Sequence, residues 1–288
     1  MKEAKTFYLA EKAVEYAKSI LGDGPEIQSI AERESGRLYL AHNLERMMLV
    51  LRLLGRFGKG KGSLLEIGSP PFIFSLLLTT HTDYSLTLSS LSEEVQKSEK
   101  SLAGRRFPLW EFNAELHRFP SDDNSFDVVL CLEVIEHLLK DPTHMLCEIH
   151  RVLKPDGILL LSTPNCLRMS KVVAMLFDRN REFKYMQCLY DRHNREYTIH
   201  ELKDLLGGVG FDTLLAKAVN FKERWKKPSI RYCYRLMNII TYLPLFRKKR
   251  KQLVIVARKC ASEPSCYRPD WLYGGEEEMG SIGERNWM

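Results

Sequence analysis

Between residues 63 and 162 the chain alternates short apolar runs with amphipathic stretches, and this alternation constrains its fold more than any other feature. The apolar runs lie at 63–67, 84–88, 126–132 and 158–162. Before the last run, residues 142–153 carry apolar side chains at helical spacing. Apolar strands that alternate with helices are typical of a parallel sheet with helices on both faces. The sequence therefore predicts an α/β fold.

The domain organisation is predicted from where this pattern begins and ends. Residues 1–58 have apolar side chains three and four apart, and we expect them to form a helical N-terminal lid. We expect the α/β domain at 59–260, with an insertion at about 222–251. Ser, Pro, Gly and Glu are frequent beyond it, so we expect 261–288 to form a poorly ordered tail.

Two further types of element are expected near the end of this domain. Thr198 and Glu201 have the spacing of a capping box, which predicts a helix that ends at Gly207-Gly208. Apolar runs at 211–219 and 252–257 predict two more strands.

Composition excludes several classes of protein. The 44% of apolar residues can build a core, and 28% are charged, so a fully disordered chain is excluded. The net charge of +6 is small for a nucleic-acid-binding protein of this length. Seven scattered cysteines without a CxxC pair indicate reduced thiols, and the first 20 residues lack the apolar core of a secretory signal. We therefore expect a cytoplasmic protein.

The residues that follow the first predicted strand are candidates for a binding site. In an open parallel sheet, ligands bind outside the carboxyl ends of the strands. Glu66 stands at the end of that strand, and Gly68 follows it. The glycine lets the backbone approach a ligand closely, and the acid can accept bonds from an ammonium or hydroxyl group. An ordinary turn explains the same residues, so this feature alone leaves both interpretations open.

The middle of the chain carries a more specific signal. Residues 119–165 read FPSDDNSFDVVLCLEVIEHLLKDPTHMLCEIHRVLKPDGILLLSTPN. In order and spacing this segment resembles the class I S-adenosylmethionine-dependent methyltransferases, and the match extends from about Leu64 to Phe211. The resemblance implies a Rossmann-like, seven-stranded methyltransferase sheet that is mostly parallel, with the last strand antiparallel. It also implies S-adenosylmethionine as the cofactor.

Two local segments resemble one subgroup of these enzymes, which is found with polysaccharide and glycosyltransferase genes. The first is the loop Ser69-Pro70-Pro71, where the family usually has more glycines, and the second is RHNREYT at 192–198. This resemblance implies O-methylation of a sugar, a glycan precursor or another small molecule, which would be the partner of the chain.

The resemblance also implies which residues hold the cofactor. Glu66, Gly68 and Ser69 stand where the family meets the amino-acid part of the cofactor. Ser90 stands where the family usually has an acid for the ribose hydroxyls, and serine binds a hydroxyl more weakly than a carboxylate does.

The remaining cofactor contacts are implied further along the chain. Glu115 stands where the family places the acid that meets the adenine amino group, and Leu116 follows it with a backbone N–H. Cys131, Leu132 and Glu133 lie just past the fourth strand, where the family surrounds the methionine and sulfonium region.

Methyl transfer to a hydroxyl needs a base, and two histidines are candidates. His137 follows the fourth strand, and His193 lies in the long connection between Pro164 and Thr198. Both could instead have structural roles. Glu133, Glu136 and His137, with His193 as a fourth ligand, could also hold Mg²⁺ or Mn²⁺, as a similar ExxEH does in two related methyltransferase groups. We predict a site without a metal.

Two alternative functions stay open. One is metal-assisted RNA 2′-O-methylation, although little basic surface is expected outside residues 222–259 and we do not expect a nucleic-acid partner. The other is a non-catalytic protein with the methyltransferase fold that has lost donor binding, an alternative that the Ser69-Pro70-Pro71 loop and Ser90 support.

One apolar and aromatic segment, at 231–246, is flanked by basic residues, including the run RKKRK at 247–251. It could be a helix that covers the active site or a dimer face. Alternatively, residues 231–251 could make peripheral contact with a membrane.

Overall fold

The computed structural model describes residues 14, 15, 18, 28, 34–102, 104–177, 192–221, 238–261 and 266–273. In these residues the strands are β1 (Lys61–Ile67), β2 (Asp83–Ser90), β3 (Gln96–Leu102), β4 (Arg105–Glu111), β5 (Phe126–Leu132), β6 (Leu153–Pro164), β7 (Phe211–Val219) and β8 (Gln252–Lys259). The α-helices are α3 (Glu34–Phe57), α4 (Ile73–His81), α5 (Pro142–Val152), α6 (Met169–Leu176) and α7 (Ile199–Val209). Two short 3₁₀ helices are η1 (Ile135–His137) and η3 (Pro244–Lys249).

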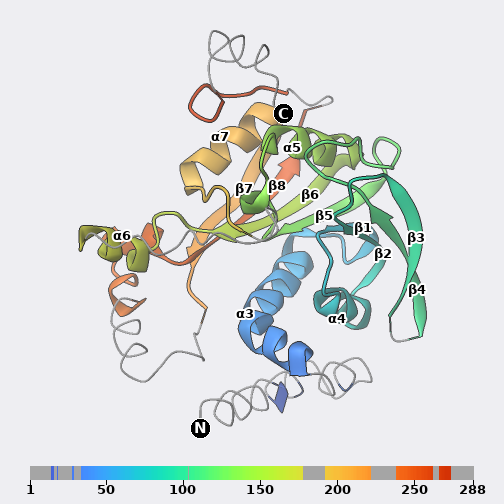
Figure 1. Cartoon of the computed structure of the whole chain (residues 1–288), viewed down its shortest axis with the longest axis horizontal. Coiled ribbons are helices and arrows are strands. Elements are labelled where there is room, and N and C mark those ends of the chain that lie inside the picture. The colour runs from blue at the N-terminus through green and yellow to red at the C-terminus, as the bar shows by residue number, and fades with distance from the viewer. Residues whose placement is uncertain are drawn as a thin grey trace, which may run out of the picture.

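The strands form one twisted sheet in the order β3-β4-β2-β1-β5-β6-β8-β7 (Figure 1). β8 runs antiparallel to β6 and β7, whereas β1 pairs in parallel with β2 and β5. This confirms the predicted α/β fold with a largely parallel sheet and an antiparallel final strand. Chain order reverses between β1 and β5, and such a switch point is where open α/β sheets bind ligands.

The sheet contains one strand more than the seven expected. β3 pairs antiparallel with β4 and forms the edge of the sheet. Its sequence, QKSEKSL, is almost entirely polar, and six of its seven residues are exposed or half-buried. An edge strand with so little buried surface leaves no apolar pattern in the sequence, which is why the strand was not predicted.

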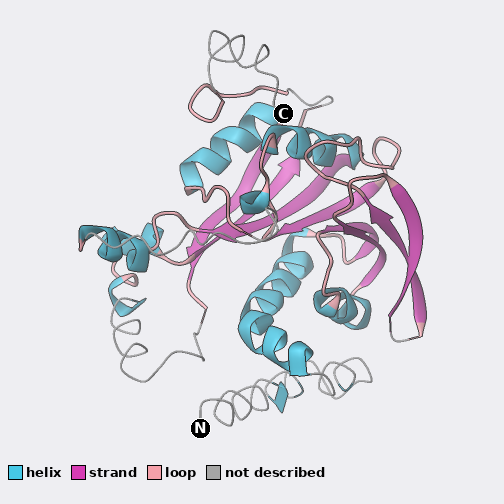
Figure 2. Ribbon diagram, in the orientation of Figure 1, coloured by secondary structure: helices cyan, strands magenta, loops and turns pink. Residues whose placement is uncertain are grey.

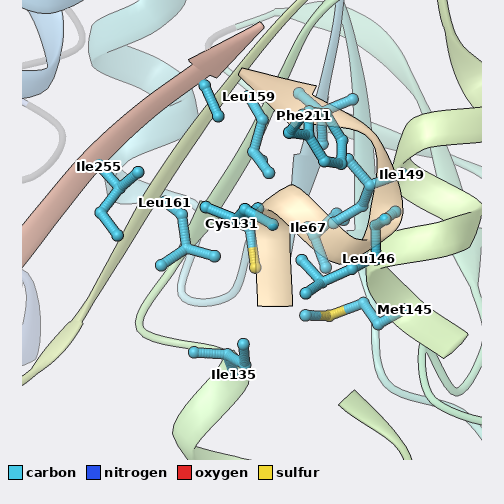
Figure 3. Packing of buried hydrophobic residues seen from close by; sticks show 14 of the residues in the cluster. Ile67, Cys131, Ile135, Met145, Leu146, Ile149, Leu159, Leu161, Phe211 and Ile255 are labelled. Atoms are coloured by element: carbon cyan, nitrogen blue, oxygen red, sulfur yellow. The ribbon is translucent and has the colours of Figure 1, made fainter. Parts of the chain in front are cut away.

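Helices cover both faces of the sheet (Figure 2). Helices α3 and α4 pack on one face, where their apolar side chains join strand residues such as Leu64 and Leu130 in one core. Helices α5 and α7 pack on the other face. There Cys131 and Leu161 of the sheet meet Leu146 of α5 (Figure 3). Alternate residues of each central strand therefore contribute to opposite cores, as the apolar runs predicted.

Some helix boundaries differ from those expected. The capping box of Thr198 and Glu201 is present, but α7 continues past Gly207 and Gly208 to Val209. The helix ends there because Gly210 adopts a left-handed conformation with φ of 109°. A Cβ at Gly210 would lie 2.8 Å from Cβ of Ala261, so the cap also needs glycine for space.

Some domain expectations lie only partly within the described residues. α3 is the described helix of the expected lid, and residues 222–237 of the expected insertion lie outside the described part. Residues 266–273 of the expected tail pack on the start of α5. There Oη of Tyr273 lies 2.6 Å from Oδ1 of Asp141, and Arg268 forms an ion pair with the same carboxylate. Among the described helices, none combines the length and the apolar character that crossing a bilayer requires.

Candidate functional site

The loop between β1 and α4 is held against the end of β2 by Ser69. The backbone N–H of Ser69 donates to the carbonyl of Ser89 at 2.8 Å. The Ser69 hydroxyl oxygen accepts from the N–H of Ser89 at 3.0 Å, and the hydroxyl itself donates to the carbonyl of Glu66. These bonds fix the loop without the additional glycines that the family usually has here.

Gly68 precedes this anchor and is required by its geometry. Its φ is +71°, in the left-handed region that favours glycine. A Cβ at this position would lie 2.8 Å from Cγ2 of Val134. The backbone of Gly68 therefore lies against the β5 loop, and both residues line a common cavity.

Glu66 is buried at the carboxyl end of β1, with 4% of its surface exposed. Its Oε2 accepts a hydrogen bond from the Ser75 hydroxyl at 2.5 Å. Burial raises the pKa of Glu66 to about 7, and the hydrogen bond from Ser75 opposes that shift. The side chain is therefore poised to become ionised when a cation, such as an ammonium group, lies against it.

Two adjoining cavities lie at this edge of the sheet, and Ile67 and Gly68 line both. The first is lined by Tyr39, Arg46, Met47, Val50, Glu66, Ile67, Gly68, Ser69, Phe74 and Leu132. The second is lined by Ile67, Gly68, Ser89, Ser90, Leu91, Phe112, Asn113, Ala114, Glu133, Val134, His137 and Leu138. The second is the larger of the two and is open to solvent. Pro70 and Pro71 are absent from both linings, so their side chains do not fill the crevice.

Arg46 and Tyr39, both on α3, line the first cavity, so this helix contributes to the site. The guanidinium of Arg46 lies 2.9 Å from Oε2 of Glu133, which follows β5 with φ of 58°. Glu133 also accepts from the Ser162 hydroxyl at 2.7 Å. Arg46 and Tyr39 were not predicted as site residues, because in the sequence this helix is marked only by its apolar face.

Glu115 and Leu116 lie outside both linings. Oε2 of Glu115 accepts from the backbone N–H groups of Leu139 and Lys140, at 2.8 and 2.7 Å. The side chain of Leu116 is exposed. The cavity is lined instead by Asn113 and Ala114, two residues earlier in the same turn, which our sequence analysis did not consider. Only the register of this turn separates the two pairs, and the sequence offers little to fix it.

The three residues predicted after the fourth strand have three different positions. Cys131 is fully buried among core side chains and lines neither cavity (Figure 3). Leu132 lines the first cavity and Glu133 the second. Cys131 and Leu132 are the last two residues of β5 and do not lie past the strand as predicted, and their side chains point to opposite faces of the sheet. Glu133 follows the strand with φ of 58°.

His137 lines the second cavity and is the last residue of the 3₁₀ helix η1. Its Nδ1 lies 3.0 Å from the carbonyl oxygen of Arg192. Its ring is 5.0 Å from the ring of His193, in an edge-on arrangement. His193 is not among the cavity-lining residues, and its Nδ1 contacts Oε1 of Glu196 at 3.2 Å. The two predicted histidines therefore lie together, with His137 nearer the cavity.

Glu136 lies beside these histidines and is fully buried. One carboxylate oxygen accepts from the Thr163 hydroxyl at 2.9 Å, and the other has no hydrogen-bond partner in the described structure. Burial, and then the nearby charge of Glu133, raise the pKa of Glu136 well above its ordinary value. Ligand atoms of Glu136, His137 and His193 lie within 4.8 Å of one another, so these three residues could hold a divalent cation.

The segment 192–197 is anchored on η1 from the other side. The backbone N–H of Asn194 donates to the carbonyl of Glu136 at 2.7 Å, and its side-chain amide donates to the carbonyl of His137. Burial acts to raise the pKa of Glu196, but hydrogen bonds from His193 and Arg168 outweigh it and lower the pKa to about 2. The hydrogen bonds of Asn194 therefore hold the backbone of η1, and with it His137, in place.

The chain resembles known proteins that are described or named as methyltransferases. A family model described as a methyltransferase domain matches residues 37–216, more than half of the chain. A curated protein of Mycolicibacterium smegmatis named "Probable S-adenosylmethionine-dependent methyltransferase" is 36% identical over 108 residues. A protein of Mycobacterium tuberculosis with the same type of name is 36% identical over 107 residues.

These alignments cover 37% of this chain in each case, so the chain spans about a third of the length of the curated relatives it matches, 37% and 34% respectively. Among solved structures, a chain in the complex of the Haloferax volcanii Trm112 methyltransferase activator has a TM-score of 0.50 and 13% identity. That alignment covers 76% of this chain and 92% of the other, and it supports the fold alone. On the family match and the observed sheet order, the chain belongs to the methyltransferase domain family, with the fold of its class I S-adenosylmethionine-dependent members.

Proposed function

We propose that the chain is an S-adenosylmethionine-dependent methyltransferase that binds its cofactor across the two adjoining cavities. The observation that carries the proposal is the position of both cavities at the switch point between β1 and β5, where they share Ile67 and Gly68. The charged groups of the first cavity suit a zwitterionic amino-acid group, because Arg46 can receive its carboxylate and Glu66 its ammonium. An adenosine group fits the second cavity, with Ser90 near the ribose and Asn113 and Ala114 near the base.

The residues that line the second cavity agree in their chemistry with such a ligand. The approach of Gly68 to Val134 leaves a backbone surface that any other side chain would fill. The second cavity combines apolar groups such as Phe112 and Leu138 with polar groups at Ser90 and Asn113. A site of this composition suits a flat base joined to a polar sugar.

The sulfonium of the cofactor supplies an activated methyl group, so the protein needs to position the acceptor and remove its proton. We propose that His137 is the base, because it lines the cavity and its Nδ1 is oriented by the carbonyl of Arg192. With Nδ1 protonated and donating to that carbonyl, Nε2 is the nitrogen that accepts a proton. The anchored segment 192–197 keeps the ring in this orientation.

For the acceptor we propose a hydroxyl of a sugar, a glycan precursor or another small molecule. The support is the sequence resemblance in the Ser69-Pro70-Pro71 loop and in residues 192–198, both of which lie near the candidate site. The metal-assisted alternative uses the same residues, Glu136, His137 and His193, and an experiment with metal chelation separates the two.

Calorimetry with S-adenosylhomocysteine tests the proposal directly. We expect saturable binding, and we expect transfer of labelled methyl groups from S-adenosylmethionine to a hydroxyl-bearing sugar acceptor. His137→Ala should lower kcat by about 100-fold or more, a far larger effect than its effect on the affinity for S-adenosylhomocysteine. His144→Ala is the matched control, since His144 contacts the backbone of His117 outside both cavities. Absence of binding at millimolar ligand would favour the non-catalytic alternative.

A further inference from the structure

The segment 239–250, which contains η3, presents apolar side chains to solvent at one edge of the molecule. Leu245 is 83% exposed and Leu243 is 56% exposed, and Ile239 and Tyr242 are exposed as well. Single exposed apolar residues are ordinary, but here Ile240 is exposed too, which makes five exposed apolar residues within seven positions. We name these five residues, Ile239, Ile240, Tyr242, Leu243 and Leu245, the apolar tip.

The apolar tip rests on a fixed base. The side-chain amide of Asn165, just past β6, donates to the carbonyls of Lys248 and Arg250 at 2.8 and 2.6 Å. Asn220, just past β7, donates to the Thr241 hydroxyl at 2.7 Å and accepts from the N–H of Lys251. Because two strand ends hold the segment from both sides, its exposed side chains belong to an ordered projection.

Basic side chains surround the apolar tip. Arg247, Lys248 and Lys249 follow it directly, and within the described part of the chain none of the three forms an ion pair. A wide cavity beneath them is also lined by Lys203 and Lys217. The lining contains one acidic residue, Asp204, whose carboxylate lies 3.0 Å from Nδ1 of His200.

We infer that the apolar tip, together with the basic residues Arg247, Lys248 and Lys249, docks this protein on the surface of an anionic lipid bilayer. Charge complementarity favours an anionic bilayer, because the apolar side chains can enter the membrane interface while lysine and arginine contact lipid phosphates, as in other peripheral anchors. An apolar protein partner would not need the uncompensated cations, and a soluble anion would not need the exposed leucines.

The position of this surface has a consequence for the acceptor. β6 and β7 end at the same edge of the sheet as β1 and β5, so the docking surface and the candidate cofactor cavities share the carboxyl edge (Figure 1). The docking itself stands without the proposed function. Its consequence, which rests on the proposed function, is that a membrane-borne acceptor such as a lipid-linked sugar would be presented to the active site.

Vesicle co-sedimentation of the full chain tests the inference. We expect binding to vesicles of phosphatidylcholine with 30% phosphatidylglycerol, weak binding to pure phosphatidylcholine, and a loss of binding as salt increases. Replacing Leu243 and Leu245 by Gln, or Arg247, Lys248 and Lys249 by Gln, should each weaken binding by more than about tenfold. Replacing Lys61, Arg105 and Arg106 by Gln removes the same charge from β1 and β4, and this control should bind as the parent does.

Binding of S-adenosylhomocysteine and cooperative thermal unfolding show whether each variant is folded, and they separate failure of docking from failure of the proposed function. Equal sedimentation with neutral and anionic vesicles, or none with either, would overturn the inference. So would an unchanged affinity in both variants. A dimer in sedimentation velocity that Leu243→Gln and Leu245→Gln convert to a monomer would assign the surface to a second copy of this chain instead.

Discussion

The guanidinium of Arg46 on α3 lies 2.9 Å from the Glu133 carboxylate at the carboxyl end of β5. This ion pair connects the N-terminal helix to the edge of the sheet where the two cavities meet. Glu133 keeps two other partners, the Ser162 hydroxyl and the side-chain amide of Gln252. Arg46 can therefore turn to an incoming carboxylate without leaving Glu133 unpaired.

Replacement of Arg46 should weaken cofactor binding. Arg46→Gln keeps the length and polarity of the side chain but removes the charge that we assign to the carboxylate of the amino-acid group. We expect the Kd for S-adenosylhomocysteine to rise by about 10- to 100-fold, as for a lost hydrogen bond between charged groups. Isothermal calorimetry measures the change, and Arg52→Gln on the exposed face of the same helix should leave the Kd within twofold. An unchanged Kd in Arg46→Gln would remove this residue from the site.

Asn113 and Glu115 should affect different properties. Asn113 lines the second cavity, so Asn113→Ala should raise the Kd for S-adenosylhomocysteine by about tenfold. Glu115 instead accepts backbone N–H groups from residues 139–141, so Glu115→Gln should lower the free energy of unfolding by about 1–3 kcal/mol. Urea unfolding and calorimetry on both variants give the comparison. The opposite result, with Glu115→Gln affecting affinity alone, would restore the role that the sequence resemblance assigned to Glu115.

Glu66 should make the stability of the ligand-free protein depend on pH. Burial raises its pKa from an ordinary 4.5 to about 7, so the folded state binds a proton that the unfolded state has already released. The contribution of Glu66 to stability is therefore complete below pH 4.5 and is lost as pH rises to 7, by about 3 kcal/mol in total.

Glu66→Gln removes this proton and keeps an acceptor for the Ser75 hydroxyl. Between pH 4.5 and 8 the variant should gain stability relative to the parent as pH rises. The measurement is chemical unfolding at a series of pH values, and Asp83→Asn, at an exposed position, serves as the control. A constant difference between the parent and Glu66→Gln across this range would show that Glu66 does not titrate in the folded protein as stated.

Removal of divalent cations should leave the proposed reaction intact. The sulfonium donor is already activated, so transfer with His137 as base needs no Lewis acid. We expect methyl transfer after dialysis against EDTA to stay within about twofold of its starting rate. Activation by Mn²⁺ that is lost in His193→Ala would instead favour the metal-assisted alternative at Glu136, His137 and His193.

The fold could be predicted from local patterns because each central strand is buried on both faces. The apolar run of β5 and the helical spacing of α5 can be read from the sequence without knowing what packs against them. The capping box of Thr198 and Glu201 is a contact between residues close in sequence. The polar edge strand β3 has no such signal, and its pairing with β4 depends on the sheet already being present.

The candidate site, too, could be predicted only in part. Its position, at the ends of β1 and β5, follows from the order of the strands. Glu66, Gly68 and Glu133 could be named because Glu66 lies at the end of a strand and the other two lie just past one. The contributions of Arg46 and Asn113 depend on how a separate helix packs and on the register of one turn, neither of which neighbouring residues determine. The sequence by itself therefore determined the sheet and the edge where chemistry can occur. Only the tertiary structure decided which side chains meet there, because contacts between distant segments are set by packing rather than by local pattern.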